Sequence, residues 1–125
     1  MSAALILFAH GARDPRWAEP FVAVAERIRL ADSGRLVQLA FLEMMVPDLQ
    51  GAADQLVAAG ATRIDVVPLF LGTGGHLRND LPPLVDSIRS AHPGLEVRLH
   101  ETIGENSAVI EAMAAAAIAM TRFGE

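Results

Sequence analysis

Residues 5–17, LILFAHGARDPRW, and residues 66–82, VVPLFLGTGGHLRNDLP, share one arrangement. In each stretch an apolar run of strand length leads to glycine and to a histidine, His10 in the first and His76 in the second. The first run is continuously apolar, which is typical of a strand buried on both faces of a parallel sheet. The repetition predicts two strands that each bring a histidine to the same place.

Strand-type and helix-type patterns alternate along the rest of the chain. The apolar runs of strand length are residues 4–9, 36–42, 64–71 and 95–99, and the helical patterns cover about 16–31, 47–59, 78–91 and 106–122. Four such pairs in succession predict a flavodoxin-like or Rossmann-like three-layer α/β sandwich, with a four-stranded parallel sheet of order 2-1-3-4 and helices on both faces. A chain of 125 residues is long enough for one such domain, spanning 1–125.

The expected helix boundaries carry recognisable end signals. Asp14 and Asp80, each followed within three residues by proline, are predicted to cap the first and third helices. Gly60 and Gly94 are predicted to end the second and third. The third helix has apolar residues at i, i+3, i+4 and i+7, which predict a stripe facing the sheet: Leu81, Leu84, Val85 and Ile88.

Composition and charge exclude several classes of protein. Ten basic and fifteen acidic residues give a net charge of −5, which argues against a nucleic-acid or acidic-membrane surface. The absence of cysteine excludes disulfides, thiolate metal sites and cysteine nucleophiles. The first residues do not resemble a signal peptide and no apolar run is long enough to span a membrane, so we expect a cytoplasmic protein.

The predicted topology places four polar residues at one edge of the sheet. Ligands of open α/β sheets bind beyond the carboxyl ends of the strands where the strand order reverses, here between the first and third strands. His10 and His76 are therefore expected on either side of one crevice, with Glu43 and His100 following the second and fourth strands. Imidazole suits Fe, Co, Ni and Zn, and a carboxylate can act as a ligand or a base.

Each of these residues also has a structural interpretation. His10 can simply end a strand, His76 can begin a helix, and Glu43 is favoured near a helix start by the helix dipole. His100 lies nearer the edge of the predicted sheet than the switch point. We interpret His92 as a structural residue at a helix end.

The glycines of residues 71–76, LGTGGH, allow a second kind of site. A glycine-rich loop between a strand and a helix can bind phosphate through its backbone amides. This loop matches neither GxGxxG nor GxxxxGK[ST], and the chain has no lysine to meet a phosphate. We interpret Gly74 and Gly75 as substrate-binding positions that let a large flat ligand approach the backbone.

Together, HGARDPRW, FLE followed by proline, and VVPLFLGTGGHLRNDLP resemble the small class II tetrapyrrole chelatases over about residues 4–104. The resemblance is to the short form of the sirohydrochlorin cobaltochelatase and ferrochelatase group. It implies insertion of a divalent metal into sirohydrochlorin, in cobalamin or sirohaem biosynthesis, with Co²⁺ favoured and Fe²⁺ or Ni²⁺ as alternatives. The metal is then a substrate, and no organic cofactor is expected. The resemblance also implies that His10 and His76 bind the metal and that Glu43 is their acidic catalytic partner.

The same resemblance suggests a role for arginine and a quaternary structure. Sirohydrochlorin carries many carboxylates, so Arg13 and Arg78, beside the two histidines, are candidate substrate-binding residues. The alternative for all three is a solvated surface residue, and this alternative has more weight for Arg16 than for Arg13 and Arg78. Longer relatives contain two such units, so a homodimer enclosing the macrocycle is expected. The alanine-rich last helix can pack on another element or on its own sheet.

Two other functions remain open from the sequence. A metal-binding carrier or sensor would use the same histidines without accelerating metallation of the ring. A flavodoxin-like domain that binds phosphate or a nucleotide would instead use the glycine loop. Stabilisation by nucleotides rather than tetrapyrroles would favour this last function.

Overall fold

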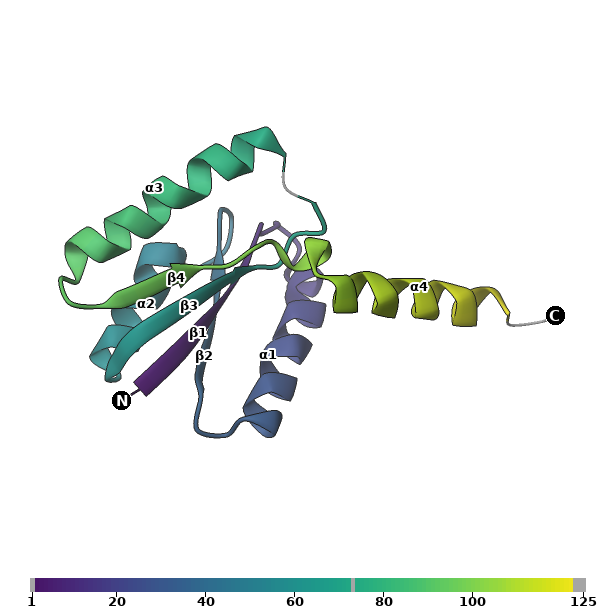
Figure 1. Ribbon diagram of the computed structural model, residues 1–125, viewed down its shortest axis with the longest axis horizontal. Helices are drawn as coiled ribbons and strands as arrows, with labels where there is room; N and C mark the ends of the chain where they lie inside the picture. Colours follow the sequence, from purple (N-terminus) through teal and green to yellow (C-terminus); the bar gives the residue numbers. More distant parts are fainter. Residues whose placement is uncertain (1, 73, 123–125) are drawn as a thin grey trace.

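The computed structural model describes residues 2–72 and 74–122, apart from the side chains of Ser2 and His76. Four parallel strands form one sheet in the order β2-β1-β3-β4 (Figure 1). The strands are β1 (Ser2–Ala9), β2 (Leu36–Phe41), β3 (Ala61–Pro68) and β4 (Glu96–Leu99). The predicted sheet and strand order are confirmed.

Three helices cover the two faces of this sheet. α2 (Leu49–Ala58) and α3 (Gly75–Ala91) enclose the larger core, which contains alternate β1 residues such as Ile6 and Phe8. α1 (Glu19–Ala31) lies on the opposite face, where Leu7, Ala25 and Val37 form a smaller core. Both faces of β1 therefore contribute to packing, as expected for a central parallel strand.

The predicted stripe of the third helix is confirmed. Leu81, Val85 and Ile88 are buried, and Leu84 is half-buried against the same core. The predicted helix ends also hold, because Gly60 and Gly94 have φ values of 103° and 91° just beyond α2 and α3. These left-handed conformations favour glycine.

The first predicted helix is divided in two. Asp14 caps a 3-10 helix, η1 (Pro15–Ala18), by accepting a hydrogen bond from the Arg16 amide at 2.9 Å. The α-helix then begins at Glu19. A continuous α-helix would require the amide of Pro20 to donate to the Arg16 carbonyl, and proline has no N–H.

The prediction for the start of the third helix was wrong. α3 begins at Gly75 with Gly74 as its N-cap, so Asp80 lies inside the helix and does not cap it. Pro82 and Pro83 also lie inside α3. Because proline has no amide hydrogen, the helix lacks two backbone hydrogen-bond donors there. Leu77 and Leu81 both pack on the core, which explains why the first turns remain helical. His76 is consequently the second residue of α3 rather than part of the loop.

The third strand is displaced towards the N-terminus relative to the prediction. It covers Ala61–Pro68 rather than residues 64–71. Pro68 ends the regular ladder because it has no amide hydrogen to donate. The chain nevertheless stays against β1 for one more residue, since the Leu69 amide donates to the Phe8 carbonyl at 2.7 Å. The other strand and helix ends lie within two residues of their predicted positions.

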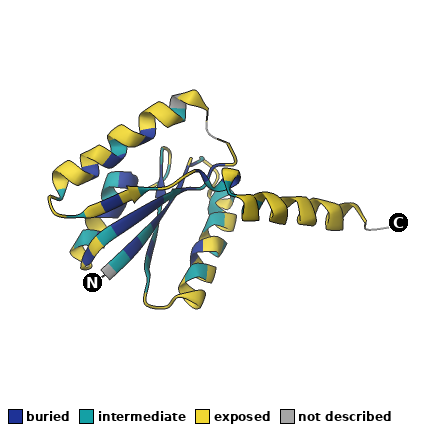
Figure 2. Cartoon of the chain, in the orientation of Figure 1, coloured by how far each residue is buried: buried dark blue, intermediate teal, exposed yellow. Residues whose placement is uncertain are grey.

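α4 (Ser107–Thr121) extends away from the rest of the molecule after a short 3-10 helix, η2 (Ile103–Glu105) (Figure 1). It is exposed along nearly its whole length (Figure 2). In the described part of the chain, no helix combines the length and apolar character needed to cross a membrane.

Candidate functional site

The end of β1 and the end of β2 are held together by backbone contacts. The Leu42 amide donates to the Ala9 carbonyl at 2.9 Å, and the Glu43 amide donates to the His10 carbonyl at 3.1 Å. These bonds continue the parallel pairing of the two strands past their ends. His10 and Glu43 are therefore placed beside each other by the sheet itself.

Gly11 makes this close approach sterically feasible. Its φ is 97°, and a Cβ atom at this position would lie 1.8 Å from the Glu43 carbonyl oxygen. Any other residue would force the loops after β1 and β2 apart and would also adopt an unfavourable backbone conformation. The glycine that follows the first histidine is thus explained by contact with Glu43.

The side chains of His10 and Glu43 form the centre of the candidate site. Nε2 of His10 lies 3.7 Å from Oε1 of Glu43, and each side chain is 50% exposed. The separation is longer than a hydrogen bond, so the two groups face one another without being locked. An imidazole and a carboxylate so placed can share a metal ion or a proton, and both remain open to a ligand.

His76 reaches the same edge of the sheet by a different route. β3 is the neighbour of β1, and the segment that follows β3 leads into the first turn of α3, where His76 lies. The side chain of His76 lies outside the described part of the structure. Among the side chains that are described, no cluster of three or more His, Asp or Glu residues is close enough to hold a metal ion.

The three candidate arginines occupy different surroundings. Arg13 is exposed in the bend between β1 and η1. Arg16 forms an exposed ion pair with Asp14 at 3.0 Å. Arg78, in the second turn of α3, has Nη2 3.5 Å from Oε1 of Glu105 and is 67% exposed. Arg16 and Arg78 thus each face a carboxylate of the chain, and the contact of Arg78 is the longer of the two.

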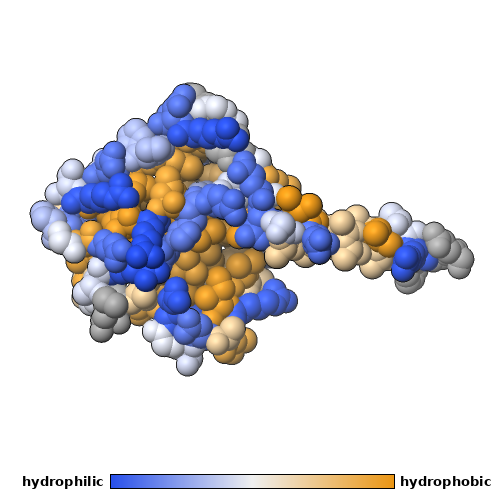
Figure 3. Space-filling view, in the orientation of Figure 1, coloured by the Kyte–Doolittle hydropathy of each residue, from blue (hydrophilic) through white to orange (hydrophobic). Residues whose placement is uncertain are grey.

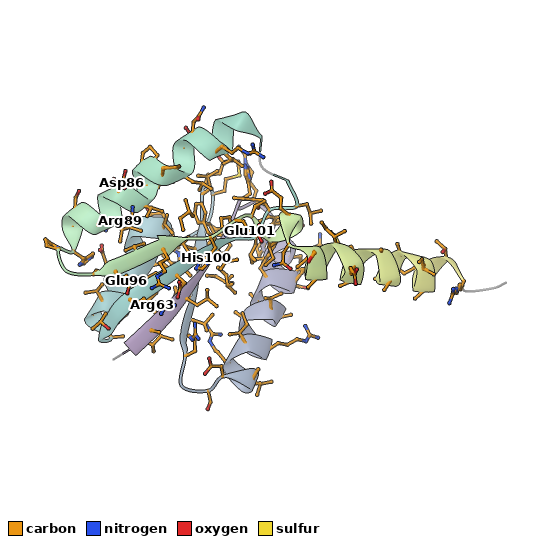
Figure 4. All side chains as sticks on the ribbon, in the orientation of Figure 1. Arg63, Asp86, Arg89, Glu96, His100 and Glu101 are labelled. Atoms are coloured by element: carbon orange, nitrogen blue, oxygen red, sulfur yellow. The ribbon has the colours of Figure 1, made fainter. Side chains whose placement is uncertain are left out.

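His100 does not join His10 and Glu43. Its Nε2 lies 2.8 Å from Oδ1 of Asp65, a buried residue in the middle of β3. Asp65 is paired in register with Leu5, well before the end of β1, so this imidazole contacts the middle of the sheet rather than its carboxyl edge. Figure 4 shows His100 near Arg63, which donates to the other oxygen of Asp65 at 3.0 Å.

Asp65 is a residue that the sequence interpretation missed. Burial raises the pKa of the Asp65 carboxyl, but hydrogen bonds from His100 and Arg63 outweigh this and hold its pKa below the ordinary value. A signal was present, because a charged residue inside an apolar strand needs a buried partner. The aspartate and the histidine after the next strand could have been paired on that ground.

His92 is confirmed at a helix end. It is the C-cap of α3, and its Nε2 lies 2.6 Å from Oδ1 of Asp54 on α2. This hydrogen bond lowers the pKa of the Asp54 carboxyl. His92 therefore connects two helices and lies at the opposite end of α3 from His76.

Two hollows lie near the carboxyl edge of the sheet. One, of about 310 Å³, lies between the end of β2 and the start of α2, where Phe41, Leu42 and Asp48 contribute to its wall. The other, of about 230 Å³, is bordered by Arg78 and His100. His10 and Glu43 line neither hollow, and their half-exposed side chains lie on an open part of the surface.

Comparison with known proteins identifies several relatives. The family model described as CbiX matches residues 4–119. A sirohydrochlorin cobaltochelatase of Saccharolobus solfataricus is 35% identical over 99 residues, covering 76% of this chain and 76% of the relative. A sirohydrochlorin ferrochelatase of Priestia megaterium is 29% identical over 108 residues, covering 86% of this chain but only 41% of the relative. The chain thus spans about two fifths of the length of that ferrochelatase.

A solved structure shares both the fold and the length of this chain. It is a CbiX protein of cobalamin (vitamin B12) biosynthesis from Marinobacter aquaeolei VT8, with a TM-score of 0.84 and 32% sequence identity. The match covers 96% of this chain and 98% of the other. The likeness therefore extends over the whole α/β unit.

Proposed function

Because the chain belongs to the CbiX family, we propose that it is a chelatase that inserts a divalent metal ion into sirohydrochlorin. The observation that carries this proposal is the His10–Glu43 pair, 3.7 Å apart beside the switch point of the sheet. Relatives named for cobalt and for iron chelation support both the substrate and the reaction type. Co²⁺ is the favoured metal, with Fe²⁺ and Ni²⁺ as alternatives.

The reaction requires ligand exchange at the metal and removal of two protons from the ring. The free macrocycle carries two pyrrole N–H groups, which are lost as the four ring nitrogens bind the divalent ion. In our proposal, His10 and His76 hold the incoming metal as neutral imidazoles and release it to the ring. The placement of His76 in the first turn of α3 supports this, since that turn follows the strand beside β1.

Glu43 is proposed to receive or relay the pyrrole protons. A half-exposed carboxylate can exchange protons with solvent, and its distance from His10 allows the two groups to act on the same ring. The proposal thus gives the histidines and the glutamate different roles. The imidazoles contact the metal, and the carboxylate contacts the departing protons.

Substrate binding is proposed to use Arg13 and Arg78 together with Gly74 and Gly75. In this proposal the exposed guanidinium group of Arg13 binds one carboxylate of the macrocycle, and that of Arg78 binds another in exchange for its 3.5 Å contact with Glu105. A Cβ atom added at Gly74 or Gly75 would meet nothing within 4 Å, so no internal contact requires glycine there. A flat ligand lying against the backbone would explain both glycines.

We further propose that two copies of the chain enclose one macrocycle. The side chains of His10 and Glu43 are half-exposed, so a ring bound beside them would have one face open to solvent, which a second subunit would cover. The proposed enzyme acts in the cytoplasm, in cobalamin or sirohaem biosynthesis, without an organic cofactor, a nucleic acid or a membrane.

The direct test follows the absorbance of sirohydrochlorin with Co²⁺, Fe²⁺ or Ni²⁺, with and without the protein, and anaerobically for iron. We expect the protein to accelerate metallation with cobalt and with at least one of the other two ions. A folded protein that binds the ions without accelerating any of the three reactions would contradict the proposal and favour a carrier. Stabilisation by nucleotides but not by the tetrapyrrole would favour a phosphate-binding function.

A further inference from the structure

Two large apolar side chains are exposed on the loop that carries Glu43. Met44 is 58% exposed and Val46 is 89% exposed, and both lie between β2 and α2, at the edge of the sheet that holds the candidate site. A single exposed apolar residue is ordinary on a protein surface. Two of them at alternate positions of one short loop, directly after a half-exposed carboxylate, require an explanation.

The other exposed large apolar residues of the described chain lie elsewhere. Most of them are on α1 or α4, and Figure 3 shows α4 as largely apolar. Leu71 lines an apolar groove together with residues of β1, β3 and α1. Met44 and Val46 line neither that groove nor the two hollows near the carboxyl edge. Their exposure is therefore a feature of the loop after β2 and not part of those surfaces.

Backbone hydrogen bonds hold this loop in place. The Phe41 amide donates to the Pro47 carbonyl at 2.9 Å, which closes the loop between its two ends. Along one side, the Glu43 amide donates to the His10 carbonyl at 3.1 Å. Because the backbone is bonded on both sides of the two apolar residues, the loop presents their side chains at a defined place.

Met44 has a backbone conformation that is unfavourable for methionine. Its φ is 65°, and no other residue except glycine has a positive φ within the described ranges. The Met45 amide donates to the Glu43 carbonyl at 2.8 Å, so Met44 is the central residue of a γ-turn of the strained kind. Glycine or asparagine would adopt this φ at lower cost. The shape of the turn therefore does not explain the methionine, whose side chain is also exposed.

The turn at Met44 is fixed relative to His10 as well. The Glu43 carbonyl that closes the γ-turn is the same group on which Gly11 packs, since a Cβ atom at Gly11 would lie 1.8 Å from its oxygen. The loop after β1 and the turn after β2 thus meet at one carbonyl group. A ligand held by His10 and Glu43 would therefore lie close to the side chain of Met44.

We propose that Met44 and Val46 form an apolar platform that contacts one face of the tetrapyrrole ring, an inference that rests on the proposed chelatase function. The ring carries its carboxylates on the periphery, where arginines can bind them, but its conjugated face is apolar. Aliphatic side chains and the polarisable thioether of methionine suit contact with such a face. This contact would keep the plane of the ring beside Glu43, as transfer of the pyrrole protons requires.

The first experiment measures the affinity for metal-free sirohydrochlorin by titration of its absorbance. Met44→Ser and Val46→Ser should each lower this affinity about fivefold, and the double variant tenfold or more, because apolar contact area is lost. Met44→Leu should remain within about twofold of the wild type. Leu30→Ser is the matched control, since Leu30 is 85% exposed on α1, and it should bind as the wild type does. The affinity for Co²⁺ should be unchanged in all variants, and its loss in Met44→Ser would identify a metal ligand instead and overturn the platform.

Ionic strength distinguishes an apolar contact from a charged one. The loss of affinity in the double serine variant should be as large at high as at low ionic strength, because salt does not screen apolar contacts. The loss in Arg13→Ala should shrink at high ionic strength, since it removes an attraction between charges. A serine effect that disappears with added salt would overturn the platform.

Met44→Gly separates the turn from the side chain. Glycine accepts the positive φ, so this variant should unfold at the same urea concentration as the wild type or at a higher one. It should nevertheless bind the ring about as weakly as Met44→Ser does. A clearly less stable Met44→Gly protein, or one that binds the ring as tightly as the wild type, would show that Met44 has a structural role only.

The outcomes keep this inference apart from the proposed function. A wild type that binds no sirohydrochlorin would overturn the chelatase function and the platform together. A wild type that binds and metallates the ring, beside a double serine variant that binds it equally well, would overturn the platform alone. Light scattering of the same samples should give one molar mass for all variants. A lower mass in the serine variants would assign Met44 and Val46 to a contact between subunits and would also overturn the platform.

Discussion

Nε2 of His10 and Oε1 of Glu43 lie 3.7 Å apart, and the backbones that carry them are bonded to each other through the Glu43 amide and the His10 carbonyl. The relative position of the two backbones is thus determined by the pairing of β1 with β2. If the two groups act as proposed, a pair supported in this way needs little rearrangement when a substrate binds. The bond between them joins backbone atoms, so either side chain can be replaced without removing it. Mutations can therefore test the roles of the two side chains separately.

The first prediction concerns His10. Replacing it by alanine should lower the rate of sirohydrochlorin metallation by about 100-fold or more, because the metal loses an imidazole at the point of transfer. The fold should persist, since the side chain is half-exposed. The measurement is the initial rate with Co²⁺, accompanied by thermal unfolding of the same sample.

The matched control for this substitution is His92→Ala. It removes an imidazole from the far end of α3, where it contacts Asp54. The rate of metallation should remain within about twofold of the wild type. Equal losses in both variants would show that removal of any histidine impairs the protein and that His10 has no special role.

The second prediction separates proton transfer from metal binding at Glu43. Glu43→Gln keeps the size of the side chain and removes its ability to accept a proton. We expect the rate of metallation to fall at least tenfold, while the affinity for Co²⁺, measured by calorimetry, changes much less. A comparable loss of affinity would identify Glu43 mainly as a metal ligand.

The topology was predictable because strand patterns and crossover rules leave few alternatives for four successive strand and helix pairs. This alone placed His10 and Glu43 at neighbouring strand ends, and their side chains are close. The start of α3 was missed because local proline signals pointed to Asp80, whereas core packing by Leu77 and Leu81 extends the helix to Gly75. Long-range packing outweighed the local signal.

Two further features depend on contacts that a single sequence does not reveal. The charge of Asp65 inside an apolar strand indicates that it needs a partner, but only the register of β3 with β4 brings His100, the residue after β4, to it. The direction of α4 depends on how Gly104 packs against Leu71. The apolar composition of α4 can be read from the sequence, but it agrees equally well with packing on the sheet of the same chain and with packing on another element.

The third prediction concerns the backbone of Gly11. Gly11→Ala should lower the free energy of unfolding by more than about 2 kcal/mol, because alanine is strained at a φ of 97° and its Cβ would meet the Glu43 carbonyl oxygen. Gly34→Ala is the control, since a Cβ there meets nothing within 4 Å. Urea unfolding of both variants provides the comparison. A Gly11→Ala protein as stable as the control would show that the loops after β1 and β2 can separate freely.

The fourth prediction uses the pH dependence of stability at Asp65. The pKa of this carboxyl is lowered in the folded state despite burial, because His100 and Arg63 donate hydrogen bonds to it. The unfolded chain therefore takes up a proton at a higher pH than the folded chain does. The stabilisation is complete above the ordinary aspartate pKa of about 4 and is lost as the pH falls through the lower folded value.

Asp65→Asn removes this titration while preserving the shape of the side chain. At pH 7 we expect a loss of about 1–3 kcal/mol in the free energy of unfolding, because a buried charged acceptor is replaced by a weaker neutral one. The difference from the wild type should narrow as the pH is lowered below about 4. Asp86→Asn, which removes a 68% exposed partner of Arg89, should cost less than about 1 kcal/mol at any pH. A constant difference between wild type and Asp65→Asn across this range would mean that the carboxylate charge does not contribute to stability.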